Sequence, residues 1–227
     1  MPDPAPNAEL LRSLGKLVRG LSALFWGLPI VLIICVQTAK TDVLHSFNVF
    51  PPLIATGWLA HSLWQLGHFQ KQERIWMNAL ERAKILALVD LGLSPFLFWW
   101  NQRPDELFYI RMVGALAVSG LLFLSNLNLV LHRLSAMLPD ENLRQETKYF
   151  ATMNRFLLLG ILLLGIVMFV LLRYPYLTVS PVDLILTYGN GSLWLLVFLA
   201  LLPLAMTMAL IWKIKEVIME SVFGPRY

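Results

Sequence analysis

Five polar residues lie within otherwise apolar stretches, where polar side chains are costly and are candidates for function. Asp90 is ionisable, and it is accompanied by Gln65, Asn126, Asn128 and Thr207. Counted along helices, each lies at a similar distance from one side of a membrane, so we expect a polar layer. Two interpretations stay open: a substrate or ion site centred on Asp90, and hydrogen bonds that hold the helices together.

Two histidines permit a different chemistry. His68 and His132 occur near the ends of the second and the fourth of six long apolar stretches, at about the same expected depth. Two imidazoles on adjacent helices can ligate the iron of a b-type haem. We keep this alternative beside the interpretation that both rings lie at the headgroup level. The main prediction includes no cofactor and no metal.

The sequence contains none of the common catalytic motifs. There is no GxSxG, HExxH or P-loop, and no apolar stretch holds a pair of carboxylates. Cys35, the single cysteine, lies in an apolar stretch, and we expect an inert buried thiol. The protein is therefore predicted not to be an enzyme.

Long apolar stretches must position these residues. Residues 156–172 hold no charge, hydroxyl or amide, and as a helix they extend about 25 Å, most of the thickness of a bilayer's hydrocarbon core. Charged residues make up 14% of the chain, well below the roughly 25% of a soluble domain. The sequence predicts an all-α, polytopic integral membrane protein with six transmembrane helices at about 21–38, 49–69, 85–100, 108–131, 156–172 and 191–212.

The domain organisation follows from these spans. Residues 1–20 are expected to be a disordered tail and an interfacial amphipathic helix, 21–212 the membrane domain, and 213–227 an amphipathic tail. The six spans also group as three helical hairpins. Gly114 and Gly120 predict a close helix contact in the fourth span.

The basic residues predict the orientation. Of the 18 lysines and arginines, 14 lie on one side of the six predicted spans, the side of both termini. The positive-inside rule places that side in the cytoplasm. We expect a multi-pass protein of a cell membrane, most simply a bacterial inner membrane. The net charge of +4 then reflects anionic lipid rather than nucleic acid.

The functional prediction is a non-enzymatic scaffold or accessory subunit of a membrane assembly. Its expected partners are the lipid bilayer and another membrane protein or a second copy of this chain, and nucleic acid is not among them. Two alternatives remain: a small transporter or channel with a polar layer around Asp90, and a haem b-binding electron-transfer subunit with His68 and His132 as ligands.

Overall fold

The computed structural model describes residues 5–41, 44–69, 73–138, 141–173 and 190–223. Every regular element in these residues is helical, which confirms the all-α prediction for this part of the chain. The elements are α1 (Ala5–Lys40), the short 3₁₀ helix η1 (His45–Phe47), α2 (Phe50–Leu66), α3 (Arg74–Leu93), α4 (Phe96–Gln102), α5 (Leu107–Ala136), α6 (Glu141–Arg173) and α8 (Asn190–Phe223).

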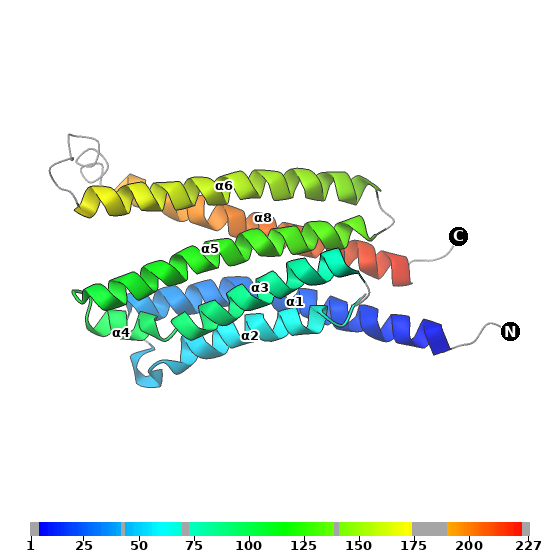
Figure 1. The fold of residues 1–227 in the computed structure, drawn as a ribbon, viewed down its shortest axis with the longest axis horizontal. Coiled ribbons are helices and arrows are strands. Elements are labelled where there is room, and N and C mark those ends of the chain that lie inside the picture. Colours follow the sequence, from blue (N-terminus) through cyan, green and yellow to red (C-terminus); the bar gives the residue numbers. More distant parts are fainter. Residues whose placement is uncertain (1–4, 42–43, 70–72, 139–140, 174–189, 224–227) are drawn as a thin grey trace.

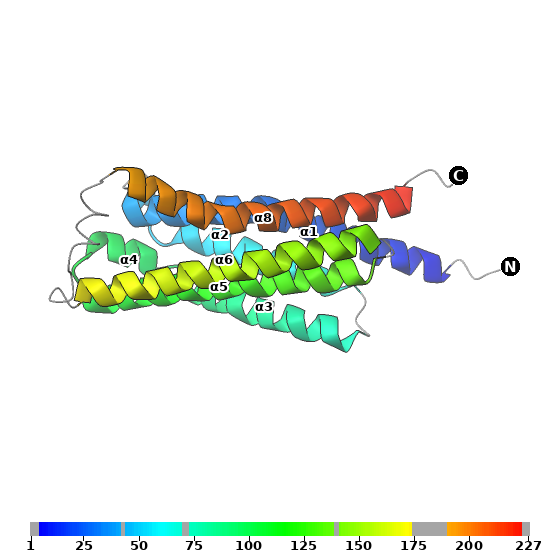
Figure 2. The ribbon, with the colours of Figure 1, turned by 90° about the horizontal axis from the view of Figure 1, so that it is seen from above.

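The long helices lie side by side in one bundle (Figure 1; Figure 2). Around the bundle, α1 packs against α2, α2 against α3, α3 against α5, α5 against α6, and α6 against α8. Helix α8 then packs against α1 and closes the ring, while the short α4 contacts α1 and α5. Each predicted hairpin is thus a packed pair, and α1 begins at the same end of the bundle at which α8 ends (Figure 1).

The predicted interfacial helix at 8–20 and the predicted first span at 21–38 form one continuous helix, α1. The helix has no break at the predicted boundary, because the buried face does not change there. Four leucines at helical spacing are no more than 5% exposed on both sides of it: Leu17, Leu21, Leu24 and Leu28. One uninterrupted apolar face favours one helix.

The predicted third span, 85–100, is divided between α3 and α4. Pro95 has no backbone N–H, so it cannot donate the helical hydrogen bond that the Leu91 carbonyl would accept. The hydroxyl of Ser94 donates to that carbonyl instead, at 2.9 Å. The hydroxyl compensates for the missing bond, and the chain turns one helical turn beyond Asp90.

Two glycines bring α1 close to α2. A Cβ atom added at Gly20 would lie 3.1 Å from the Ser62 carbonyl oxygen, and one added at Gly27 would lie 2.9 Å from a methyl group of Leu59. The glycine contact predicted in the fourth span was wrong, because a Cβ atom at Gly114 or Gly120 would meet no other atom within 4 Å. Small residues permit a close approach only where a neighbouring helix faces them.

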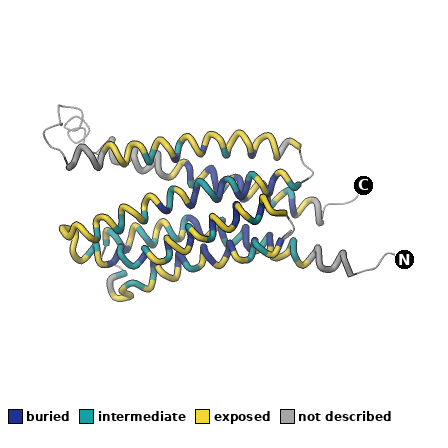
Figure 3. The backbone as a smooth tube through the Cα atoms, in the orientation of Figure 1, coloured by how far each residue is buried: buried dark blue, intermediate teal, exposed yellow. Residues whose placement is uncertain are grey.

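Large apolar side chains cover much of the outside of the bundle. Phe156 is 70% exposed, Ile54 65% and Trp26 62%, and exposed residues run along most of α6 (Figure 3). A soluble monomer rarely exposes so much apolar surface, whereas a bilayer accommodates it. The exterior therefore indicates a membrane environment.

Four helical stretches among the described residues are long and apolar enough to cross a membrane: Arg12–Lys40, Arg74–Gln102, Leu107–Ala136 and Arg144–Val167. They support four of the six predicted spans. Helix α2 has 17 residues, about 25 Å of helix, which is at the lower limit of the length of a span. The side chains of residues 191–200, in the predicted sixth span, lie outside those described. The count of six remains a prediction.

Candidate functional site

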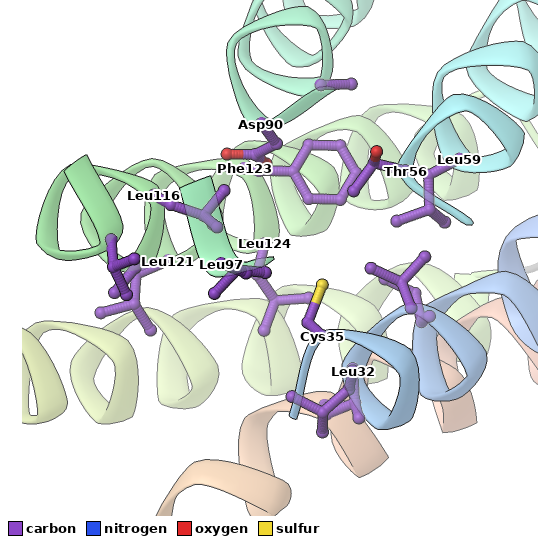
Figure 4. A pocket seen from close by; sticks show the side chains of 17 residues that line it. Leu32, Cys35, Thr56, Leu59, Asp90, Leu97, Leu116, Leu121, Phe123 and Leu124 are labelled. Carbon is purple, nitrogen blue, oxygen red and sulfur yellow. The ribbon is translucent and has the colours of Figure 1, made fainter. Parts of the chain in front are cut away.

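The main candidate site is a cavity of about 350 Å³ inside the bundle. Helices α1, α2, α3, α4, α5 and α8 all contribute to its wall, and the cavity is partly open to the outside of the bundle. In Figure 4, Asp90, Thr56 and Phe123 lie along one side, and Cys35 and Leu32 lie opposite. The lining residues are Leu28, Val31, Leu32, Cys35, Thr56, Leu59, Ala87, Asp90, Leu97, Val113, Leu116, Ala117, Gly120, Leu121, Phe123, Leu124 and Leu204.

The cavity wall is almost entirely apolar. Its lining includes one hydroxyl, one thiol and one carboxyl, those of Thr56, Cys35 and Asp90. The Thr56 hydroxyl lies 2.7 Å from the Pro52 carbonyl oxygen, to which it donates, and 3.3 Å from the Ser94 hydroxyl. These contacts occupy Thr56 within the protein and leave Asp90 as the main polar group facing the space.

Asp90 is 9% exposed, and its Oδ1 atom has no hydrogen-bond partner among the described residues. Ser119 of α5 lies close enough to interact with the Asp90 carboxyl. However, the Ser119 hydroxyl oxygen makes no well-formed hydrogen bond with a described residue. A buried carboxyl oxygen without a donor costs free energy. The arrangement therefore leaves an acceptor available to a bound molecule.

A second polar cluster, the Thr207 node, joins α5, α6 and α8 through Asn128, Asn154 and Thr207. Each of these residues is at most 3% exposed. The Thr207 hydroxyl donates to the Pro203 carbonyl at 2.8 Å and accepts from the side-chain amides of Asn128 and Asn154 at 3.1 and 3.0 Å. Asn154 also donates to the Pro203 carbonyl, at 3.1 Å. With its hydroxyl fully used, this node is suited to holding helices together.

The five residues of the predicted polar layer separate in the structure. Asn128 and Thr207 meet in the node, whereas Asp90 lies in the cavity wall. Gln65 lies 3.0 Å from His61 of its own helix, and Asn126 donates to the Leu122 carbonyl of its own helix. Similar depth along helices does not determine which way each side chain points, so the five residues make different contacts, and a shared polar layer stays a prediction.

The haem alternative gains no support from the helix arrangement. His68 is exposed, and its Nδ1 atom lies 3.1 Å from the Trp64 carbonyl oxygen. His68 follows α2, and His132 belongs to α5. These two helices make little direct contact, because α3 packs against both of them. The haem alternative therefore stays a prediction from the sequence.

Sequence reasoning missed Asn154. It is two residues before the apolar stretch at 156–172, outside the six predicted spans. The available signal was its helical spacing from Leu158, because both side chains lie on the buried face of α6. Sequence reasoning also did not connect Cys35 and Thr56 with Asp90, since their helices are distant along the chain.

No protein-family model, curated protein or solved structure matches this chain. Its class therefore rests on its own features. Helices long and apolar enough to span a bilayer, arranged with apolar side chains on the outside, define a helical membrane protein. The Asp90 cavity gives that class its most specific chemical feature.

Proposed function

We propose that this membrane protein is not an enzyme and that it binds an amphipathic molecule in the Asp90 cavity, as a small transporter or carrier. The observation that carries the proposal is the unpartnered Asp90 Oδ1 atom in the wall of an otherwise apolar cavity. At about 350 Å³, the cavity falls within the size range of small-molecule sites.

The wall favours a ligand with an apolar body and one donor group. The apolar side chains of the wall offer no hydrogen bonds to a polar molecule. They favour an alkyl or aromatic body, because its apolar surface is buried on binding. The Asp90 carboxyl accepts hydrogen bonds and attracts positive charge, so it favours an amine or another protonated group. A carboxylate ligand would be repelled.

Three molecules that share a ten-carbon chain test this chemistry: decylamine, decanol and decanoate. We expect the purified protein in lipid nanodiscs to bind decylamine about 10- to 100-fold more tightly than decanol, because the positive charge of the ammonium group strengthens a hydrogen bond to the carboxyl that both ligands can donate. Decanoate should bind most weakly. Isothermal titration with each ligand measures the order.

Asp90→Asn should reduce the preference for decylamine over decanol to within about threefold, because it removes the charge and keeps the shape. Asp105→Asn is the matched control, since Asp105 is exposed in the segment between α4 and α5. Ala87→Leu should weaken the binding of all three ligands, because the larger side chain fills space in the cavity that Ala87 lines. Equal binding of the amine and the alcohol, unchanged by Asp90→Asn, would contradict the proposal.

We also propose that the end of the bundle where α1 begins and α8 ends faces the cytoplasm, in a bacterial inner membrane or another membrane that follows the positive-inside rule. The support is the excess of basic residues predicted for that end. Reporter fusions at both termini check this orientation. Activity there of a reporter that functions only outside the cytoplasm would contradict it.

The accessory-subunit function is kept as the second candidate. Tyr149 and Phe156, seven residues apart on one side of α6, are 71% and 70% exposed, and large exposed aromatic side chains are common in interfaces. A membrane-protein partner or a second copy of the chain would cover this side. If none of the ten-carbon ligands binds, co-purification of a stoichiometric partner becomes the deciding measurement.

A further inference from the structure

Four basic side chains gather where α5 ends and α6 begins. His132 and Arg133 belong to the last turns of α5, and Arg144 and Lys148 are four residues apart, on one side of α6. Helices α5 and α6 pack against each other. Arg133, Arg144 and Lys148 all act electrostatically on the His132 imidazole. We call these four residues the basic cluster.

No residue of the basic cluster forms an ion pair with an acidic side chain among the described residues. The ion pairs among the described residues join Arg103 to Glu106 and Lys213 to Glu146, and none of them includes a residue of the cluster. Glu146, the acid nearest in sequence to Arg144 and Lys148, is therefore paired with Lys213 of α8. Glu141 is exposed at the start of α6 and makes no ion pair with Arg144. Cations held together without an acid attract an anionic ligand.

Unsatisfied polar atoms occur on both helices of the cluster. His132 Nδ1 is buried and has no hydrogen-bond partner among the described residues, and the same holds for the Thr147 hydroxyl, next to Lys148. Thr147 is 0% exposed. A protonated imidazole nitrogen donates to oxygen, so the His132 side chain offers a donor to a ligand that carries acceptor oxygens.

The position in the chain corresponds to the level of lipid headgroups. His132 directly follows the apolar stretch of α5, and Tyr149, which follows Lys148, is 71% exposed. Aromatic and basic side chains commonly mark this level of a membrane protein. Basic pockets between helices at the cytoplasmic side bind the headgroups of anionic lipids.

We propose that the basic cluster binds the phosphate of an anionic phospholipid, with its acyl chains along the exposed apolar surface of α6. Arg144 and Arg133 present planar guanidinium groups suited to phosphate oxygens, and Lys148 adds a point charge. The site is separate from the Asp90 cavity, since none of its four residues lines that cavity.

Native mass spectrometry of the detergent-purified protein with added phosphatidylglycerol or phosphatidylcholine tests the site. The protein should retain one phosphatidylglycerol about tenfold more tightly than phosphatidylcholine. The double variant Arg144→Gln/Lys148→Gln should bind phosphatidylglycerol about tenfold more weakly than the unaltered protein does. The matched control is Arg74→Gln/Arg82→Gln, which removes two exposed cations from α3 and should change the affinity by less than twofold.

Thermal unfolding of each variant shows whether it is folded, and Arg133→Gln supplies an independent variant if the first double variant unfolds. Equal losses in the cluster and control variants would overturn the proposal, because they would indicate general charge attraction. Displacement of the lipid by an equal concentration of glycerol 3-phosphate would overturn the lipid assignment in favour of a soluble phosphate. Asp90→Asn should leave lipid retention unchanged, which separates this test from that of the cavity.

Discussion

Replacing Trp76 by alanine is expected to lower the free energy of unfolding by about 3–5 kcal/mol, the usual cost of truncating a fully buried tryptophan. Trp76 is 0% exposed and belongs to the main apolar core, which also includes Leu80 of α3 and Leu134 of α5. The surrounding helices are fixed by their other contacts, so the space left by the indole would not close fully. Equilibrium unfolding in mixed micelles measures the loss.

Two controls separate packing from other effects. Trp76→Phe should cost clearly less than the alanine variant, because it keeps most of the ring volume and Nε1 has no hydrogen-bond partner in the described residues. Trp58→Ala should cost less than about 1 kcal/mol, because Trp58 is 51% exposed on α2. Equal losses for Trp76→Ala and Trp58→Ala would contradict the burial of Trp76.

Thr207→Val is expected to lower the free energy of unfolding by about 1–2 kcal/mol. Valine keeps the shape but removes the hydroxyl that accepts from both Asn128 and Asn154. Asn128 keeps its bond to the Leu124 carbonyl and Asn154 keeps its bond to the Pro203 carbonyl, so neither amide is left without a partner. Single hydrogen bonds between membrane helices average about 0.6 kcal/mol, and two are lost here.

The same unfolding measurement on two further variants checks this interpretation. Thr207→Ser retains the hydroxyl and should be more stable than Thr207→Val. Thr152→Val removes a hydroxyl that donates only to the Lys148 carbonyl of its own helix, on an exposed side of α6, and should change stability little. If Thr207→Val is as stable as the unaltered protein, the node does not hold the helices together.

The sequence predicted where helices exist better than where they break. The apolar stretch at 156–172 lies within α6, as expected, because no other structure satisfies its backbone in a bilayer. The continuity of α1 through residues 20 and 21 was not predicted, because charge was given more weight than the continuous row of leucines. The turn at Pro95 was missed because it lies inside an apolar stretch, where composition carries no signal for a break.

The candidate site was predicted only in part. Asp90 stood out in the sequence as a polar residue within an apolar stretch, and the structure places it in a cavity wall. Its neighbours Cys35 and Thr56 come from helices far away in the sequence, and spacing within one helix cannot show which helices meet. The sequence predicted the depth of Asn128 and Thr207, but their contact with Asn154 depends on how the helices are rotated.

The contact between α1 and α8 affects how the bundle assembles during synthesis. Phe25 of α1 packs against Trp212 of α8, with ring centres 5.6 Å apart, although the ribosome makes α8 long after α1. Until α8 arrives, the side of α1 that it covers must face lipid or a chaperone of the insertion machinery. The ring of helices therefore cannot close during translation of the first helices, and a chain interrupted before α8 would expose this side to cellular quality control.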